Sequence, residues 1–436
     1  MAQERDELNK RRQEREARRK KRQAEQRKLK IKLAIAAVVL VLSGLGISQL
    51  TKNVGAPDEN AVSVIATEAA TEPSAEAPTE SGRYNTPTTV IHIKAAGDLT
   101  VTDRVVASAD TDLGYDYSGA FLDVAPLLAD ADLTMLNYEG NLVGPPYGTA
   151  SASAPQELMT ALADAGVDIV QMANSYSIHN GMIGLATTLN NIRAAGIEPV
   201  GAFPTNAEFK SSKGYTICNV QGVKVAVVAF TKGMGGLGLP AGSENCVNVL
   251  YSDYATEYRK VNKEGITAIL KNLAEEAPDI TIAMLHWGSE YNDTISETQQ
   301  DIVTLMQKNG VDVILGTHSH RVQELSYDSA TGNFVAYSLG DFFGDGAKDG
   351  TKYSILLDLE ITKDNETGIT KVTDFSYTPL YILSESESKR GRQVVRIAET
   401  MSAYDVNFVD KVVGSAYTGM QSSLTRISNR VEGKYK

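Results

Sequence analysis

An 18-residue stretch without a single charged side chain sets the strongest limit on how this chain can fold. The stretch, LAIAAVVLVLSGLGISQL, occupies residues 33–50, and as a helix it would be about 27 Å long, which matches the hydrocarbon core of a bilayer. Lys32 and Lys52 border it and can extend their ammonium groups to the lipid headgroups. We therefore expect one transmembrane helix over residues 33–50.

The charges beside this stretch predict its orientation. Residues 1–32 hold 14 Lys and Arg against 6 Asp and Glu, and such an excess marks the cytoplasmic side of a membrane helix. A cleaved signal peptide is the competing interpretation, but Ser48-Gln49-Leu50 matches its small-residue cleavage site poorly. A buried core helix is disfavoured because nothing polar interrupts the run. The sequence thus favours an uncleaved single-pass anchor in the cell membrane, with a cytoplasmic basic tail on anionic lipid and an extracellular main domain. RNA binding by the tail is the lesser alternative.

After the basic tail the chain is strongly acidic. Of 42 Lys and Arg and 54 Asp and Glu in the chain, 28 and 48 follow residue 32, which gives this part a net charge of −20. We expect no nucleic-acid partner for it, because phosphates require a positive surface. Cys218 and Cys246 are the only cysteines in the sequence, and a disulfide and two buried thiols both stay open.

The composition then separates a stalk from a folded domain. Residues 51–89 are rich in Ala, Thr, Glu, Pro and Ser, and they have too little apolar surface to offset chain entropy, so we predict a disordered linker. From residue 90 onward, we predict strands at 90–96, 133–136, 168–172, 223–230, 280–285, 311–315, 333–338 and 352–361, and helices at 155–165, 184–195, 253–276 and 296–309. Strands joined by helices pair in parallel, whereas the helix-free stretch from 333 to 381 predicts antiparallel additions. After about residue 389 the pattern weakens to a polar helix or tail.

Polar side chains follow several of the predicted strands. The carboxyl ends of parallel strands meet at one edge of a sheet, and binding sites form there. The segments at these ends are Gly97-Asp98, Asn137-Tyr138-Glu139, and residues 173–181, 286–290 and 316–320. Four of the five histidines of the chain lie in them, while His92 lies inside a strand, where we expect it to face solvent.

Imidazole and carboxylate groups on converging loops are ligands for a divalent transition metal such as Mn, Zn or Fe. We predict that Asp98, Glu139, His286, His318 and His320 hold one or two ions, because two metals about 4 Å apart can clamp the oxygens of a phosphoryl group. Each residue also has a simpler interpretation. Asp98 is then a turn residue, Glu139 a helix cap, and the His-x-His loop one that hydrogen-bonds the backbone. The metal-site prediction rests on the five residues taken together, because they follow successive strands in this order.

These segments, in this order, resemble the CapA family of capsule-synthesis proteins, whose domain is similar to the calcineurin-type metallophosphoesterases. The matching motifs are Gly97-Asp98, Asn137-Tyr138-Glu139, His286 to Tyr291, Gly316 to His320, and Tyr337 to Phe342, with Asp341 where the family has Asn. The resemblance covers residues 90–343. It implies an α/β fold, a metallophosphoesterase-like layered α/β/β/α domain at residues 90–385, followed by a polar C-terminal extension at 386–436.

One segment departs from the family pattern. At residues 173–181 the chain reads Ala-Asn-Ser-Tyr-Ser-Ile-His-Asn-Gly, so Ser175 and Tyr176 replace an Asn that binds metal and a His that acts as an acid. A Tyr, with an unperturbed pKa of about 10, is a poorer acid near neutral pH. We therefore expect a weak or empty second metal site, with Asn174 as a further ligand. The candidate catalytic residues are Tyr176, His179 and Glu290, although Glu290 is equally a solvated charge.

The resemblance implies a role in the synthesis, export or attachment of an extracellular polymer like poly-γ-glutamate. The expected partners are the lipid bilayer, an anionic polymer or its precursor, and a membrane synthase complex. Predicted substrate contacts are Asn137, Arg104, Arg321 and Asp341, the two arginines being ordinary surface residues in the alternative interpretation. The retained histidines leave open an active extracellular metal-dependent phosphoesterase or other hydrolase, and a stalked ligand-binding domain is a third hypothesis.

Overall fold

A computed structural model describes residues 87–405 and 412–433. The predicted basic tail, the predicted transmembrane helix at residues 33–50 and the linker up to residue 86 lie outside the described residues. Within the described ranges, none of the helices combines the length and the apolar composition that a membrane span requires. The chain from Pro87 onward forms one compact unit.

The larger of two main sheets begins with the first predicted strand. Its order is β16-β15-β14-β1-β4-β5-β6, and β13 pairs with β1 as well. Its strands are β1 (Thr88–Thr100), β4 (Leu133–Glu139), β5 (Ile169–Gln171), β6 (Glu198–Val200), β13 (Asp341–Phe343), β14 (Tyr353–Asp364), β15 (Thr370–Leu383) and β16 (Gln393–Arg396). From β1 to β6 the pairing is parallel, and β14, β15 and β16 add antiparallel strands on the other side.

The second sheet has the order β11-β12-β10-β9-β8-β7. Its strands are β7 (Thr216–Val220), β8 (Val223–Thr231), β9 (Ile280–His286), β10 (Val313–Thr317), β11 (Leu325–Asp328) and β12 (Asn333–Ala336). The four central strands run parallel, and β7 and β11 are antiparallel edge strands. A two-stranded hairpin of β2 (Asp110–Thr111) and β3 (Gly114–Tyr115) stands apart from both sheets.

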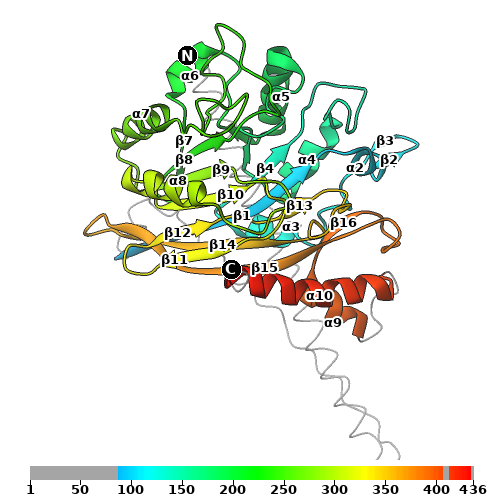
Figure 1. Cartoon of the computed structure of the whole chain (residues 1–436). Coiled ribbons are helices and arrows are strands. Elements are labelled where there is room, and N and C mark those ends of the chain that lie inside the picture. Colours follow the sequence, from blue (N-terminus) through cyan, green and yellow to red (C-terminus); the bar gives the residue numbers. More distant parts are fainter. Residues whose placement is uncertain (1–86, 406–411, 434–436) are drawn as a thin grey trace, which may run out of the picture. The chain divides into compact units, whose positions relative to one another are not determined.

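Nine helices in the described ranges cover the sheets. They are α2 (Asp103–Ala107), α3 (Ala125–Asp130), α4 (Gln156–Ala165), α5 (Gly181–Ala195), α6 (Asn206–Ser212), α7 (Lys263–Ala274), α8 (Glu297–Lys308), α9 (Ile397–Asp405) and α10 (Gly414–Val431). Figure 1 shows α7 and α8 beside the second sheet and α9 and α10 on the far side of the first sheet. The order of layers is therefore helix, sheet, sheet, helix, as predicted.

The apolar run at residues 223–230 shows why the sheets stack. Successive side chains of a strand point to opposite faces. Val225, Val227 and Ala229 join the core that includes the first sheet, whereas Val228 and Phe230 join a second core with α7 and α8. Both faces of β8 are thus buried, which accounts for a strand that lacks polar alternation.

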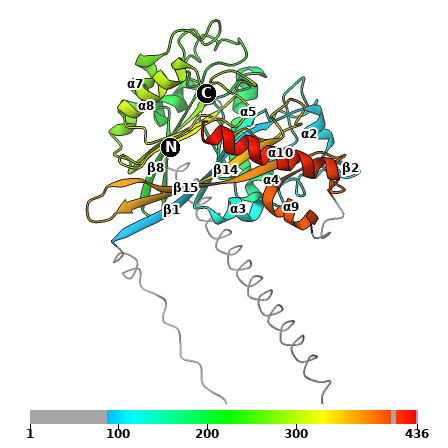
Figure 2. The same ribbon diagram turned by 60° about the horizontal axis from the view of Figure 1, so that its bottom comes forward.

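The C-terminal stretch, predicted as a polar helix or tail, packs on the first sheet. Strand β16 pairs with β15, and α10 contacts β14 and β15 (Figure 2). Val394, Met420 and Ile427 are buried in the same core as β1. The folded unit therefore continues past residue 385.

One predicted helix has the wrong start, and one predicted kind of strand pairing is confirmed only in part. The helix predicted at residues 253–276 begins only at Lys263, because the carboxylate of Asp253 accepts the backbone N–H groups of Arg259 and Lys260 and closes a loop instead. The antiparallel additions predicted for the helix-free stretch are present in β14 and β15, but β12 pairs in parallel with β10 and β13 pairs in parallel with β1.

The structure also tests the predictions for the two cysteines and for His92. The thiols of Cys218 and Cys246 are buried and not joined in a disulfide. His92 is exposed on β1, as expected, with its Nδ1 atom 3.1 Å from a carboxylate oxygen of Asp358.

Candidate metal centre

The predicted ligands lie where the carboxyl ends of strands from both sheets meet. Strand pairing sets this arrangement. Asp98 of β1 is in register with Asn137 of β4 and with Asp341 of β13, and Thr317 of β10 is in register with His286 of β9. The side chains of the predicted ligands are all buried in one cluster, with no more than 5% of any residue exposed. The residues of this cluster are Asp98, Glu139, His286, His318 and His320.

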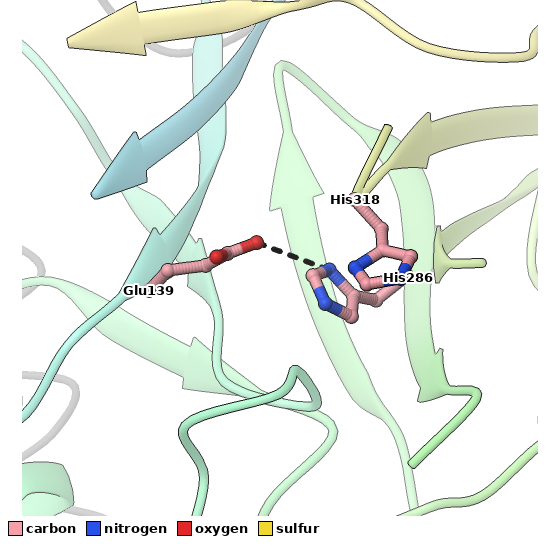
Figure 3. A group of neighbouring side chains, drawn as sticks. All are labelled: Glu139, His286 and His318. Carbon is pink, nitrogen blue, oxygen red and sulfur yellow. Dashed lines mark ion pairs between the residues drawn. The ribbon is translucent and has the colours of Figure 1, made fainter. Parts of the chain in front are cut away.

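One group of potential ligands consists of Glu139, His286 and His318. Their ligand atoms all lie within 4.8 Å of one another. Figure 3 shows the carboxylate of Glu139 pointing from β4 toward the ring of His286, with Oε1 and Nδ1 separated by 3.4 Å. The rings of His286 and His318 are 4.4 Å apart between centroids. One ion could be held between these three side chains.

A second group consists of Asp98, His320 and Asp341, again with ligand atoms within 4.8 Å of one another. His320 Nδ1 lies 2.8 Å from Asp341 Oδ1 and 3.6 Å from Asp98 Oδ2. His320 Nε2 lies 3.9 Å from Glu139 Oε2, so the two groups are neighbours. Asp341, which we predicted to contact substrate, is therefore a potential ligand, because β13 pairs with β1 and brings the two carboxylates together.

Two asparagines hold the carboxylates in place. Asn137 Nδ2 donates to Asp98 Oδ1 at 2.6 Å and to Glu139 Oε1 at 3.1 Å. Asn137 Oδ1 accepts from Asn174 Nδ2 at 3.1 Å, and Asn174 Oδ1 accepts from the backbone N–H of Tyr176 at 3.0 Å. Both amide oxygens are engaged within the protein. Asn137 thus orients the two carboxylates, and Asn174 orients Asn137, while their assignments as substrate contact and metal ligand stay predictions.

The backbone around the cluster is unusual. His318 and His320 have φ angles of 87° and 58°, in the left-handed region that costs a non-glycine residue about 1–3 kcal/mol. The backbone N–H of His318 donates to Asp98 Oδ2 at 3.1 Å. At Gly97 an added Cβ would lie 1.7 Å from the carbonyl oxygen of Gly340, so no other residue fits there without a shift of the backbone. Such strain at a polar cluster is typical of a functional site.

Two of the three imidazoles are in the form that binds metal. Burial lowers the pKa of His286 and of His318 well below the ordinary value, and neighbouring cationic groups, including Lys232, lower it further. A neutral imidazole is the ligating form. His320 differs. Burial acts to lower its pKa, but the carboxylates around it, Asp341 first, outweigh burial and raise it well above 6.5.

The three carboxylates repel one another inside the protein. Burial raises the pKa of Asp98, and that of Glu139 well above its ordinary value, while His320 opposes both shifts. Burial also raises the pKa of Asp341 to about 6, again against the influence of His320. The charges of Asp98 and Asp341 raise the pKa of Glu139 further. A bound cation would relieve this repulsion.

The residues of the cluster fit a divalent metal. His318 Nδ1 is buried and has no hydrogen-bond partner among the described residues, so one ring nitrogen of this candidate ligand is left without a protein partner. The donor set mixes carboxylate oxygen with imidazole nitrogen, which Mn, Zn and Fe all accept. Two adjacent groups of three ligands could hold one ion or two.

The altered third segment also contacts the cluster. Ser175 Oγ lies 3.0 Å from His286 Nε2, which leaves Nδ1 of that ring facing Glu139. Tyr176 is half-buried, and burial with the charges of Glu139 and Glu290 raises its pKa to about 12. Tyr176 therefore stays protonated near neutral pH, and its hydroxyl can donate a hydrogen bond to a bound oxygen.

Four predicted site residues are not brought into the cluster. His179 is exposed, with Nε2 3.1 Å from the carbonyl oxygen of Ala150. Glu290 is exposed at the rim. Arg104 is exposed on α2, and no hydrogen bond or ion pair within residues 87–405 and 412–433 joins its side chain to the cluster. Arg321 is paired with Asp293 at 3.3 Å.

Sequence reasoning missed Ser175 as a partner of His286 and missed Lys232 altogether. The signal for Lys232 was present, because this residue directly follows β8 at the same edge of the sheet. For Ser175, the sequence showed only a departure from a pattern. The contact of Ser175 with His286 depends on the packing of the third segment beside β9, which the sequence does not show.

Comparisons with known proteins agree with the resemblance seen in the sequence. The profile described as "Bacterial capsule synthesis protein PGA_cap" matches residues 92–345, which include every residue of the cluster. The chain is 28% identical over 266 residues to the "Capsule biosynthesis protein CapA" of Bacillus anthracis, covering 59% of this chain and 61% of that protein. It is 25% identical over 292 residues to the "PGA biosynthesis protein CapA" of Bacillus subtilis, covering 65% and 71%. The match thus spans less than two thirds of the first relative's length.

Solved structures show weaker similarity. A calcineurin-like phosphoesterase, YfkN from Bacillus subtilis, has a TM-score of 0.39 at 18% identity, covering 67% of this chain and 91% of that one. A hypothetical protein from Thermus thermophilus has a TM-score of 0.40 at 12% identity, covering 66% and 98%. We draw no inference from these two similarities.

Proposed function

Because this chain belongs to the PGA_cap family of bacterial capsule synthesis proteins, we propose that it is a membrane-anchored, extracellular component of capsule polymer synthesis, export or attachment. The polymer we propose is an anionic one like poly-γ-glutamate. The observation that carries the proposal is the pair of buried ligand groups, which lies wholly within the residues that match the family.

The proposed anchor is the uncharged stretch at residues 33–50, preceded by 14 basic residues. This topology would place the cluster on the side of the membrane where a capsule chain is completed. In intact cells, protease added from outside is expected to release the domain while leaving the N-terminal tail with the membrane. Release of the whole chain by salt washing alone would contradict an anchor of this kind.

The side chains of the cluster have separable tasks in this proposal. Glu139, His286 and His318 would hold a first ion, and Asp98, His320 and Asp341 a second. A bound divalent ion would supply Lewis acidity toward a carbonyl or phosphoryl oxygen.

The polar groups around the ligands fix the geometry of the site. Asn137 keeps the two carboxylates of Asp98 and Glu139 apart and oriented, and Ser175 fixes the ring of His286. Tyr176 would donate a hydrogen bond to the bound polymer.

An active metal-dependent hydrolase is the second candidate function. The observation that favours it is the retention of three imidazoles and three carboxylates in the arrangement that metal catalysis requires. Against it stands Tyr176, whose pKa of about 12 makes it a poor proton donor to a leaving group. Hydrolysis would add water across an amide or phosphoester bond, and this candidate predicts turnover, whereas a polymer-handling role predicts binding alone.

The full chain purified in detergent tests both candidates. We expect bound divalent metal in the wild type, loss of most of it in His318→Ala, and no change in His92→Ala, because His92 is an exposed histidine outside the cluster. Metal-dependent release of amine from γ-glutamyl oligomers, or of alcohol from phosphodiesters, would establish the hydrolase. Polymer binding without turnover would support the non-hydrolytic role. Absence of both metal and polymer binding would overturn the proposed function.

A further inference from the structure

Lys232 lies next to the metal centre but belongs to neither ligand group. It directly follows β8, whose last residue, Thr231, is in register with His286 of β9. The backbone N–H of Lys232 donates to the carbonyl oxygen of His286 at 2.8 Å. The position of this lysine is therefore fixed by the same strand pairing that places a candidate ligand.

The ammonium group of Lys232 is held by neutral partners. Nζ donates to the carbonyl oxygen of Gly288 at 2.6 Å and lies 4.8 Å from the centre of the Tyr258 ring. Tyr258 belongs to the loop at residues 253–262, where a helix was predicted, so this loop packs against the side chain of Lys232. An ammonium group has three donors, and the carbonyl accounts for one of them.

No carboxylate in residues 87–405 and 412–433 forms an ion pair with Lys232. Glu290, exposed in the loop after β9, acts on it only at longer range. The charge of Lys232 in turn reaches the rings of His286 and His318. A half-buried cation with neutral partners, on the residue that bonds the backbone of His286, has the properties of an anion-binding group.

The charge of the chain after residue 32 favours such a group for the proposed substrate. After residue 32 the chain has a net charge of −20, so an anionic polymer is repelled by most of the surface. A polymer of γ-linked glutamate carries one carboxylate on each residue. Whichever of its bonds reached the metal centre, a carboxylate would therefore lie within a residue of that bond.

We propose that Lys232 is the charged group of an anion subsite beside the metal centre, and that this subsite binds a carboxylate of the polymer next to the bond presented to the ligands. The inference rests on the proposed function for the identity of the polymer. The geometry of the subsite rests on the contacts of Lys232 alone. A phosphate would satisfy the same ammonium group, so the test includes inorganic phosphate.

The experiment measures binding of two fluorescent oligomers to the full chain in detergent, each with Mn²⁺ and with EDTA. One oligomer is γ-linked glutamate, and the other has every free carboxylate converted to an amide. The variants are Lys232→Met, which keeps the apolar stem, Lys232→Arg, which keeps the charge, and Lys271→Met, which removes an exposed lysine from α7.

We expect the wild type to prefer the acidic oligomer and Lys232→Met to bind it about tenfold more weakly, the value of one hydrogen bond to a charged group. Affinity for the amide oligomer should stay unchanged in this variant. Lys232→Arg should recover the preference in part, and Lys271→Met should match the wild type. The effect should persist in EDTA, because it depends on the lysine rather than on a metal.

An unchanged preference in Lys232→Met would overturn the subsite while leaving the proposed function in place, since the polymer would still bind. A wild type that binds neither oligomer would overturn the proposed function, and the carboxylate subsite with it. Displacement of the acidic oligomer by inorganic phosphate at lower concentration than by free glutamate would also overturn the assignment to a carboxylate.

Discussion

The imidazole of His320 lies among three carboxylates, and this placement makes protons and metal ions compete for the same atoms. Asp341 is the nearest of the three at 2.8 Å, and together they raise the pKa of His320 well above 6.5 against the effect of burial. The pKa of Asp341 itself is raised to about 6, chiefly by burial. Without metal, the second group therefore holds protons at pH values where exposed side chains would have released them.

Metal affinity should for this reason fall as the pH falls. A metal binds only deprotonated ligands, so a raised pKa extends competition from protons to higher pH. For each proton that the metal must displace, the apparent affinity for the metal falls about tenfold per pH unit below the pKa of the group that carries the proton. We expect affinity for Mn²⁺ to drop steeply between pH 7 and pH 5, where Asp341 takes up its proton near 6. Titration against a competing chelator at each pH measures the slope, and Asp341→Asn should make it shallower. If the pH dependence of Mn²⁺ affinity is the same in Asp341→Asn as in the wild type, the competing proton is not on Asp341.

At this scale, the sequence was sufficient to predict which five side chains gather in one buried cluster, but not the residues that surround them. Asp98 and His286 follow predicted parallel strands, and strands of one sheet bring such residues to a common edge. The role of Asp341 depended on which strand β13 would join, which nothing in a three-residue strand reveals. Residue type alone also does not show which hydrogen bonds an amide makes, so the link from Asn174 through Asn137 to the carboxylates was not predicted.

Among the elements, α10 supports the loops of the candidate metal centre although it lies outside the matched family region. Arg430 Nη2 donates to Asp293 Oδ2 at 2.7 Å, and its Nη1 donates to the carbonyl oxygen of Val322 at 3.3 Å. Asp293 lies two residues beyond Tyr291, whose ring stacks on His320 at 5.4 Å. The C-terminal helix thus holds both the loop after β9 and the loop after β10.

Arg430→Gln should therefore weaken both stability and metal binding. The loss of hydrogen bonds to a partly buried charge should lower the free energy of unfolding by about 2 kcal/mol. A more mobile loop would also hold the Tyr291 ring less firmly against His320, which should lower the affinity for metal. Thermal unfolding and a metal titration of the full chain measure the two effects.

The matched control for this substitution is Arg396→Gln, which breaks a pair with Asp123 at 3.2 Å that touches neither loop. It should reduce stability and leave metal affinity unchanged. Equal loss of metal affinity in the two variants would show that α10 acts on the fold in general rather than on these loops.

Each of the twelve elements predicted from hydrophobic periodicity has a counterpart in the structure, and the late start of α7 has a local cause. Ser296 and Gln299 form a capping box, and α8 begins within a residue of its predicted start. Residues 253–262 have the composition of a helix, yet Asp253 binds two backbone N–H groups of the loop and Asn262 caps α7. Local hydrogen bonds from Asp and Asn compete with helix formation, and periodicity does not report them.

For the whole molecule, the layered arrangement was predictable because each of its layers leaves a pattern. Strands buried on both faces read as continuous apolar runs, as in β8, and helices read as amphipathic segments. The end of the domain was not predictable in the same way. Residues after 389 look polar, and their few apolar side chains, such as Met420 and Ile427, become meaningful only when β14 and β15 provide a surface for them.

Removing that stretch gives the strongest test of where the domain ends. A chain stopped after Glu385 would lose β16, α9 and α10 and would expose the outer face of β14 and β15. Val394, Ile397, Met420 and Ile427 are each at most 1% exposed, and burying a side chain of this kind contributes about 1.5–3 kcal/mol. Their combined loss is comparable to the whole stability of an average domain, about 5–15 kcal/mol. We therefore expect the shortened chain to lose cooperative unfolding and metal binding, whereas a chain stopped after Gly433 should behave as the full chain does. A chain stopped after Glu385 that unfolds cooperatively at an unchanged temperature would mean that the C-terminal helices are an accessory to a domain already complete without them.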